Sequence, residues 1–143
     1  MSDLSKGRLR LWIRLLRVTR GAENRLREYL RVSCATTLPR FDVMAALYRR
    51  RDGVTMSELS RLLLVSNGNA TAVVDRLEAE GFARRTQSET DRRSYYVVLT
   101  EAGISAFEEQ AAGHEREVDA FFGNLTEAEI DTLTRILERM SKS

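Results

Sequence analysis

At 143 residues, with 43% hydrophobic and 31% charged side chains, the chain is long and apolar enough for one folded domain and is not intrinsically disordered. A single cysteine, Cys34, excludes an intrachain disulfide, and no membrane-spanning run or signal-peptide core is present, so we expect a cytoplasmic protein. The net charge of +2 divides into +6 over residues 1–39, +2 over 40–100 and −6 over 101–143. Arginines make up 21 of the 23 basic residues, which is compatible with a nucleic-acid partner, although GC-rich coding gives the same bias.

Two helices are predicted in the first third of the chain. Apolar residues recur at helical spacing between Gly7 and Val32, which predicts one long helix with Gly21 as its weak point. Pro39 suits the first turn of a second helix, and Gly53 is a suitable stop for it. The apolar residues of this second helix are Phe41, Val43, Met44 and Leu47.

Two short helices are predicted next. Thr55 and Glu58 fit a capping box at the start of the first, whose inward residues are Leu59, Leu62 and Leu63. Ser66 is a suitable N-cap for the second and Gly81 a suitable stop. The expected buried stripe of the second helix is Ala70, Val73, Val74 and Leu77. Two short helices joined by a tight turn are typical of a helix-turn-helix.

A β-hairpin and two further helices complete the predicted fold. Residues 82–87 (FARRTQ) and 94–99 (SYYVVL) favour strands, and residues 88–93 (SETDRR) favour a polar turn. Thr100 then begins a long helix that reaches about Phe122, and Thr126 with Glu129 caps a last helix. The order predicts a mainly α, winged helix-turn-helix fold in which the small hairpin is the wing.

The hairpin carries a specific motif. Asp91, Arg93, Val97, Leu99 and Thr100 fit the pattern DxRxxxVxLT. Together with LSRLLLVSNGNATAVVDRLEAEGFARR at 59–85, the motif resembles the MarR family of bacterial transcription regulators, and the resemblance covers nearly the whole chain. The segments TTLPRFDVMAAL and TMSELSRLLLVSNGNATAVVDRL are similar to regulators of aromatic-acid catabolism, some of which respond to hydroxycinnamoyl-CoA or related thioesters.

The resemblance implies a homodimeric architecture and a regulatory role. Residues 1–38 and 101–143 would form a helical dimerisation region, and residues 39–100 a winged helix-turn-helix that binds double-stranded DNA at a palindromic operator. The protein would act as a repressor that a small aromatic or aromatic acyl-CoA effector releases. The last helix also has an apolar stripe with no evident partner in one small subunit: Leu125, Ile130, Leu133, Ile136 and Leu137.

The second short helix is suited to the major groove. Its buried stripe leaves mostly small or amide side chains outward: Asn67, Gly68, Asn69, Thr71, Ala72, Asp75 and Arg76. The asparagines can pair with adenine edges, Thr71 can contact a phosphate or a thymine methyl, and Gly68 permits close approach to phosphate. The alternative is that Ser66, Asn67 and Asn69 only cap the helix.

Two arginines stand at the tip of the predicted wing. The resemblance implies that Arg93 enters the minor groove, with Arg92 as a phosphate-contacting neighbour and Asp91 holding the Arg93 guanidinium in place. The alternative is a solvated turn with an exposed ion pair worth under about 1 kcal/mol. Further phosphate candidates, which surface charge explains equally well, are Arg84, Arg85 and Arg49–Arg51.

The resemblance also suggests where an effector would bind. In the family, small anionic aromatics bind between the first helix, the second helix and the helix after the wing. By that analogy a pocket would be lined by Trp12, Leu16, Phe41, Met44 and Phe107, with Arg40 or first-helix arginines taking the anionic group. The alternative is ordinary core packing for the apolar residues and surface charge for Arg40. Arg10, Arg14 and Arg17 can bind CoA phosphates or pair with the acidic C-terminal helices.

Other classes of function have weaker support in the sequence. Cys34 suggests a thiol-based redox sensor, but it follows the first helix instead of lying near its start, and a free buried cysteine is the simpler interpretation. His114, the one histidine, is expected at the surface and cannot form a zinc site with one cysteine. Without a nucleophile–base arrangement or a phosphate-binding glycine loop, we expect no enzyme and no cofactor or metal. A helical adaptor that does not bind DNA is the remaining alternative.

Overall fold

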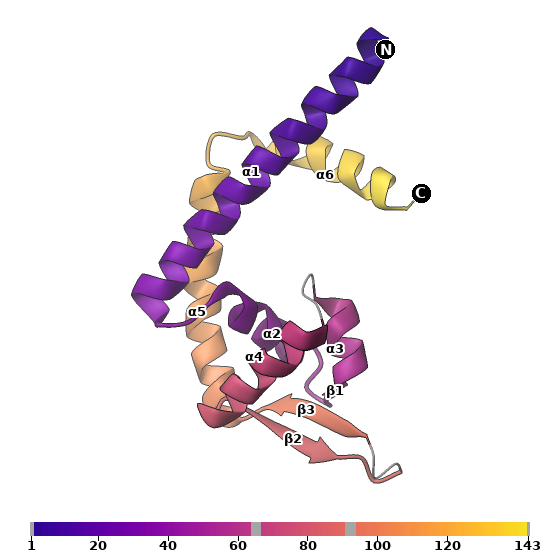
Figure 1. The fold of residues 1–143 in the computed structure, drawn as a ribbon. Coiled ribbons are helices and arrows are strands. Elements are labelled where there is room, and N and C mark those ends of the chain that lie inside the picture. The colour runs from indigo at the N-terminus through magenta and orange to yellow at the C-terminus, as the bar shows by residue number, and fades with distance from the viewer. Residues whose placement is uncertain (1, 64–66, 91–93, 143) are drawn as a thin grey trace.

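The computed structural model describes residues 2–63, 67–90 and 94–142 and consists of helices with one small sheet (Figure 1). Its elements are α1 (Asp3–Cys34), α2 (Leu38–Arg49), β1 (Val54–Thr55), α3 (Met56–Leu62), α4 (Asn67–Ala79), β2 (Ala83–Gln87), β3 (Tyr95–Leu99), α5 (Glu101–Phe121) and α6 (Glu127–Ser141). The helices α1 and α5 form a long arm, and α2 to β3 form a module at one end of it (Figure 1). The predicted mainly α, winged helix-turn-helix fold is confirmed.

The sheet joins the hairpin to a strand that lies before the helix-turn-helix. Its strand order is β1–β3–β2, and both pairings are antiparallel. Val54 of β1 pairs with Val97 of β3, and Ala83 of β2 pairs with Leu99. These four side chains are buried, so the wing is anchored to the core as predicted for Val97 and Leu99. Gly53, with φ 115°, adopts a left-handed conformation that lets the chain turn from α2 into β1.

One hydrophobic core holds the module together and reaches the end of α1. Met44 and Leu47 of α2, Leu59 of α3 and Val74 of α4 all belong to it. Its remaining fully buried members are Leu30, Val43, Val54, Leu77 and Val97. Leu62, expected to face inward, is instead exposed, because α3 ends there and buries Leu59 alone.

Threonine side chains begin four of the helices. Thr37, Thr55, Thr100 and Thr126 each accept a hydrogen bond from the backbone N–H three residues later. At Thr126 the reciprocal bond from the backbone N–H to Glu129 completes the predicted capping box. At Thr55 the predicted capping box is half formed: the Glu58 backbone N–H donates to the Thr55 hydroxyl, but the Glu58 carboxylate lies 3.5 Å from the Arg50 guanidinium.

The long arm depends on close contact between α1 and α5. Gly21 was expected to be a weak point of the first helix, but α1 continues through it without a break. The ring of Phe121 packs beside Gly21. At Gly113 of α5 a Cβ atom would overlap the hydroxyl of Tyr29, so glycine is needed for the two helices to approach. Arg25 of α1 and Glu117 of α5 form an ion pair of 2.7 Å on the surface of the arm.

The outer helix carries apolar side chains in solvent. Every residue of α6 is exposed. Its apolar stripe comprises Ile130, Leu133, Ile136, Leu137 and Met140, and further apolar side chains are exposed on the first half of α1: Leu4, Leu9, Leu11, Trp12, Ile13 and Val18. Among the described residues no helix is long and apolar enough to cross a membrane.

Candidate nucleic-acid interface

Helix α4 buries one narrow stripe and exposes the rest of its surface. Ala70, Val74 and Leu77 face the core, and Val73 is half-buried, as the spacing predicts. The candidates Asn69, Thr71 and Arg76 are exposed, as are Ala72 and Asp75. Asn67 and Gly68 form the first turn of α4, but their surroundings lie outside the described part of the structure, as does Ser66.

An ion-pair cluster connects α4 to the wing. The guanidinium of Arg85 on β2 lies 2.6 Å from Asp75 Oδ1 and 2.7 Å from Glu78 Oε1. The backbone N–H of Arg85 also donates to Glu78 Oε2 at 3.0 Å. Arg85 therefore links the hairpin to α4, whereas its neighbour Arg84 is exposed.

The base of the wing turn is shaped by short polar side chains. The backbone N–H of Ser88 donates to the carbonyl of Ser94 at 3.0 Å, and that of Thr90 donates to the hydroxyl of Ser88 at 3.3 Å. Ser88 is buried. The tip residues Asp91, Arg92 and Arg93 lie outside the described residues, so their predicted roles stay predictions.

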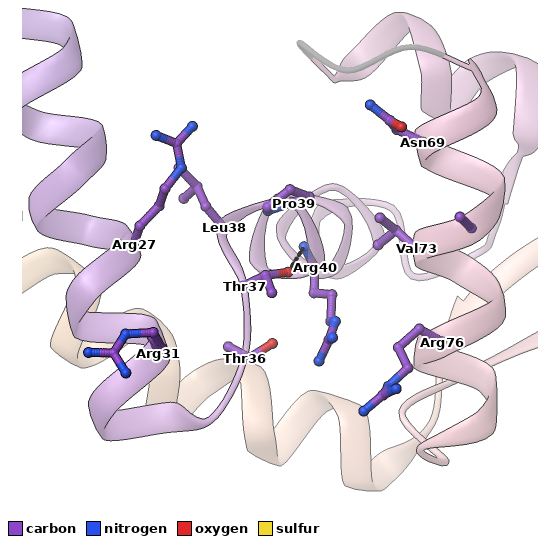
Figure 2. A pocket seen from close by; sticks show the side chains of 11 residues that line it. Arg27, Arg31, Thr36, Thr37, Leu38, Pro39, Arg40, Asn69, Val73 and Arg76 are labelled. Carbon is purple, nitrogen blue, oxygen red and sulfur yellow. Dashed lines mark hydrogen bonds between the residues drawn. The ribbon is translucent and has the colours of Figure 1, made fainter.

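A solvent-open cavity of about 600 Å³ lies between α4, the end of α1 and the start of α2 (Figure 2). Its polar wall contains four arginines: Arg27, Arg31, Arg40 and Arg76. Its remaining lining is mostly apolar or small: Thr36, Thr37, Leu38, Pro39, Ala72 and Val73, with Asn69 of α4. Among the described residues that line it, none is acidic. The sequence analysis did not predict this cavity. The one feature of the sequence that could have indicated it is the spacing of four residues between Arg27 and Arg31, which places both arginines on one face of a helix.

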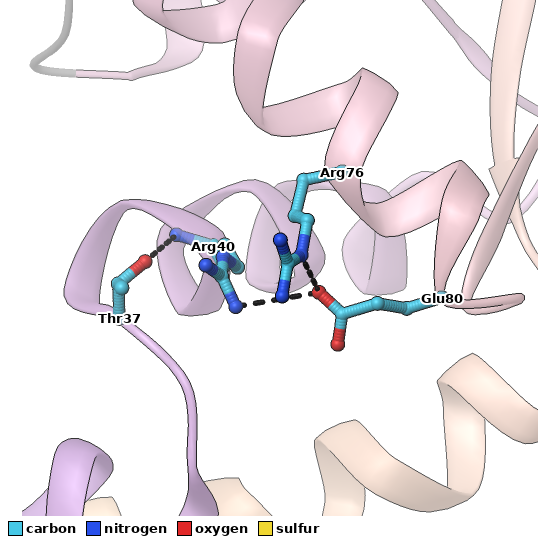
Figure 3. A network of polar contacts seen from close by, with 4 residues as sticks. All are labelled: Thr37, Arg40, Arg76 and Glu80. Atoms are coloured by element: carbon cyan, nitrogen blue, oxygen red, sulfur yellow. Dashed lines mark hydrogen bonds and ion pairs between the residues drawn. The ribbon is translucent and has the colours of Figure 1, made fainter.

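Two of these arginines share one carboxylate oxygen (Figure 3). Arg40 Nη1 of α2 donates to Glu80 Oε1 at 3.3 Å, and Arg76 Nε of α4 donates to the same oxygen at 3.0 Å. The Arg40 and Glu80 side chains are only 20% and 29% exposed, so this contact is partly shielded from water. Glu80 thereby ties α2 to the end of α4.

The structure separates the residues expected to line an effector pocket. Phe41 and Phe107 stack with ring centroids 5.3 Å apart and, with Met44, belong to the core. Trp12 is 56% exposed and lies 18 residues before the buried Leu30, about 27 Å along α1. Leu16 is half-buried on the same half of α1. Arg40 lines the cavity between α1, α2 and α4 instead, and Phe41 does not.

His114 and Cys34 are both half-buried. His114 was expected at the surface, but its ring stacks on Phe41 with centroids 4.4 Å apart, and burial lowers its pKa below 6.5. Cys34 interacts with Tyr29: burial raises the pKa of that hydroxyl, and a hydrogen bond shared with the Cys34 thiol raises it further. Among the described residues no three His, Cys, Asp or Glu side chains gather as a metal site would require.

Comparison with known proteins points to one family. The model of the MarR family matches residues 36–95, which contain the helix-turn-helix. The chain is 29% identical over 132 residues to the HTH-type transcriptional regulator MhqR of Bacillus subtilis (strain 168), covering 92% of this chain and 90% of the relative. It is 30% identical over 143 residues to an uncharacterized HTH-type transcriptional regulator of Bacillus cereus, covering 99% and 93%. Its fold is similar to that of a mutant E. coli MarR in complex with operator DNA, with TM-score 0.83, 28% identity and 97% and 99% coverage.

Proposed function

Because the chain belongs to the MarR family of DNA-binding transcriptional regulators, we propose that it binds a palindromic operator as a homodimer and represses transcription in the cytoplasm. A small anionic effector, of the aromatic acid or aromatic acyl-CoA class, releases it from the operator. The protein acts by binding and not by catalysis.

The exposed surface of α4 carries the proposal for DNA binding. Burial of Ala70, Val74 and Leu77 turns Asn69 and Thr71 outward near the start of the helix, where a recognition helix meets base edges. Asn69 suits an adenine edge, and Thr71 suits a phosphate or a thymine methyl. Asn67 and Gly68 precede them in the first turn, and Arg76 adds positive charge at the far end of α4.

The wing supports the same proposal. In sequence, Arg92 and Arg93 lie between β2 and β3, the two strands of a hairpin that Arg85 links to α4. We propose that Arg93 enters the minor groove, that Asp91 orients it, and that Arg92 contacts a phosphate. Helix and wing then contact adjacent grooves of one half-site.

Dimerisation through residues 1–38 and 101–143 follows from the surface of the arm. The exposed stripe on α6 and the exposed apolar residues of α1 are apolar surface of the kind that marks a contact between proteins. The net charges of +6 for residues 1–39 and −6 for residues 101–143 favour contact between the first segment of one subunit and the last of its partner. Two recognition helices then meet half-sites about one helical turn apart, roughly 34 Å.

A mobility-shift titration of Arg93→Ala tests the function. We expect wild-type protein to bind the DNA upstream of its own gene with a steep salt dependence. Arg93→Ala should weaken this binding by about tenfold or more, since one guanidinium leaves the minor groove, while the dimer stays intact. Arg135→Ala removes the same charge from an exposed position on α6 and should leave the affinity unchanged.

The titration also separates the alternatives. A helical adaptor would bind no duplex DNA at any salt concentration. A thiol sensor would lose operator affinity on treatment with peroxide, and Cys34→Ser would abolish that loss. Equal operator affinity for wild type and Arg93→Ala would remove the wing from the interface.

A further inference from the structure

We propose that Asp75 of α4 determines part of the DNA sequence that the protein recognises: its carboxylate, held by Arg85 of β2, accepts a hydrogen bond from the amino group of a cytosine in the major groove. The inference rests on the proposed function, because it adds a base contact to the helix that is proposed to enter that groove. Asp75 lies at least one turn further along α4 than Asn69 and Thr71, so it contacts a different base.

Asp75 lies on the side of α4 that faces away from the core. At 3.6 residues per turn, it is about 130° around the helix from the middle of the buried stripe. Its side chain is exposed, and its outward neighbours one turn away, Ala72 and Ala79, are exposed and end at Cβ. The carboxylate therefore stands above the surface around it, where it can meet base edges if α4 lies in the groove.

The wing holds this carboxylate in place. Arg85 Nη2 donates to Asp75 Oδ1 at 2.6 Å, and Nη1 of the same guanidinium donates to Glu78 Oε1 at 2.7 Å. The backbone N–H of Arg85 donates to Glu78 Oε2 at 3.0 Å, so the guanidinium is fixed from two sides. Its contact with Asp75 uses Oδ1, and Oδ2 can accept a hydrogen bond from a further donor, because each carboxylate oxygen has lone pairs of its own.

The chemistry of a carboxylate selects what it can contact on a duplex. An ionised carboxylate only accepts hydrogen bonds, whereas phosphate oxygens and the major-groove edge of guanine are acceptors themselves. The donors in that groove are the amino groups of cytosine and adenine. Adenine presents its N7 acceptor beside the amino group, and N7 would face the carboxylate, so cytosine is the better partner for Asp75.

The charge of the cluster favours selectivity over affinity. Asp75 and Glu78 carry two negative charges and Arg85 carries one positive charge, so the cluster as a whole is negative. Phosphates on both sides of the groove repel it on every sequence, and only a correctly placed amino group offsets that repulsion. Asp75 should therefore weaken binding to unrelated DNA and strengthen binding to the operator relative to it.

Selection of duplexes from a random pool by the full-length protein, followed by titration, tests the inference. Wild type should select a cytosine at one position of each half-site, and replacing that base pair should weaken binding by about tenfold or more. Asp75→Asn should lose the preference for cytosine there, because an amide pairs best with an adenine edge. The variant should also bind a duplex of unrelated sequence about threefold or more tightly, since one negative charge leaves the interface.

Two further variants separate the contact from its support. Glu78→Gln removes a carboxylate from the same cluster without removing Asp75, and it should keep the cytosine preference. Arg85→Gln keeps the Asp75 carboxylate but no longer holds it, and it should reduce the cytosine preference without replacing it by adenine. Circular dichroism of each variant measures whether the helices are retained.

The outcomes distinguish this inference from the proposed function. If Asp75→Asn binds every duplex more tightly and selects the same sequence as wild type, the carboxylate only repels DNA and the inference is overturned. A uniform loss of affinity in Asp75→Asn overturns it as well, because the residue then acts on the wing and not on a base. A cytosine preference that Arg85→Gln leaves intact overturns the role given to Arg85. If wild type enriches no sequence from the pool, the proposed function fails, and the inference fails with it.

Discussion

The Arg85 guanidinium on β2 lies 2.6 Å from the Asp75 carboxylate on α4, across ten residues of sequence. Glu78 adds a second carboxylate at 2.7 Å. The Arg85 side chain is 24% exposed, whereas the side chains of Asp75 and Glu78 are 62% and 40% exposed, so water screens the two carboxylates. Two carboxylates on one half-buried guanidinium make the cluster somewhat stronger than a single exposed ion pair. The angle between the wing and α4 depends on this cluster.

We expect Arg85→Gln to lower the free energy of unfolding by about 1 kcal/mol, because it leaves Asp75 and Glu78 as like charges without their shared cation, while water screens both carboxylates. Urea unfolding measures the change. Arg84→Gln, at the exposed neighbouring position on β2, should change stability by less than about 0.5 kcal/mol. Additive effects of Arg85→Gln and Asp75→Asn in a double-mutant cycle would contradict the coupling.

The crossing of α1 and α5 gives a second prediction. A Cβ atom added in Gly113→Ala would overlap the Tyr29 hydroxyl, so the two helices must move apart. Overpacking of this kind costs about 1–3 kcal/mol, and it outweighs the gain of up to about 1 kcal/mol from replacing glycine in a helix. Urea unfolding should show a net loss, and adding Tyr29→Phe should recover part of it.

Gly7→Ala is the matched control for this prediction. It makes the same change in α1, at a position where an added Cβ meets no atom within 4 Å. We expect a gain in stability from the helix propensity alone. A loss in both variants would show that the overlap with Tyr29 is not the cause.

The features that the sequence predicted correctly depend on neighbours in the chain. The capping box at Thr126 and the N-caps at Thr55 and Thr100 involve residues three positions apart, although Glu58 does not complete the box predicted at Thr55. The buried stripe of α4 repeats within two turns. The ends of the wing strands follow from the turn residues between them. These features can be predicted without knowing which other elements pack against the helices and strands.

The features that the sequence did not predict depend on residues far apart in the chain. β1 has two residues, too few for any periodicity, and it exists because Val54 pairs with Val97. The arginine-lined cavity combines Arg31 of α1 with Arg76 of α4, and no motif joins them. His114 is half-buried because Phe41, 73 positions earlier, stacks on it. These contacts become known only when the helices are placed relative to one another.

The stack of His114 on Phe41 predicts a pH dependence of stability. Burial lowers the pKa of His114 below 6.5, so the folded state binds a proton less readily than the unfolded state. The free energy of unfolding should therefore fall as the pH drops below 6.5, and it should not change through this group at higher pH. Urea unfolding between about pH 5 and pH 8 measures the slope.

His114→Phe separates this contribution from others, because it keeps an aromatic ring against Phe41 and cannot titrate. Since His114 is the one histidine in the chain, the slope near pH 6.5 should disappear in the variant. Asp42 acts at lower pH and in the opposite direction: burial raises its pKa above 3.8, so its contribution to stability falls as the pH rises above that value. A slope near neutral pH that survives in His114→Phe would exclude the stack as its origin.

The exposed stripe of α6 gives the last prediction. Leu133 is 46% exposed in the single subunit and lies between Ile130 and Leu137 on one helix face. If this face packs against a partner subunit, Leu133→Glu buries an unpaired charge there and removes apolar contact, which should raise the dimer dissociation constant by about a hundredfold or more. The monomer should keep its fold, because α6 buries none of its residues within the subunit.

Sedimentation velocity measures the dissociation of the dimer, and circular dichroism measures the helix content. Arg135→Glu, on the opposite face of α6, is the control. A Leu133→Glu protein that stays dimeric with wild-type affinity would place the subunit contact on another surface.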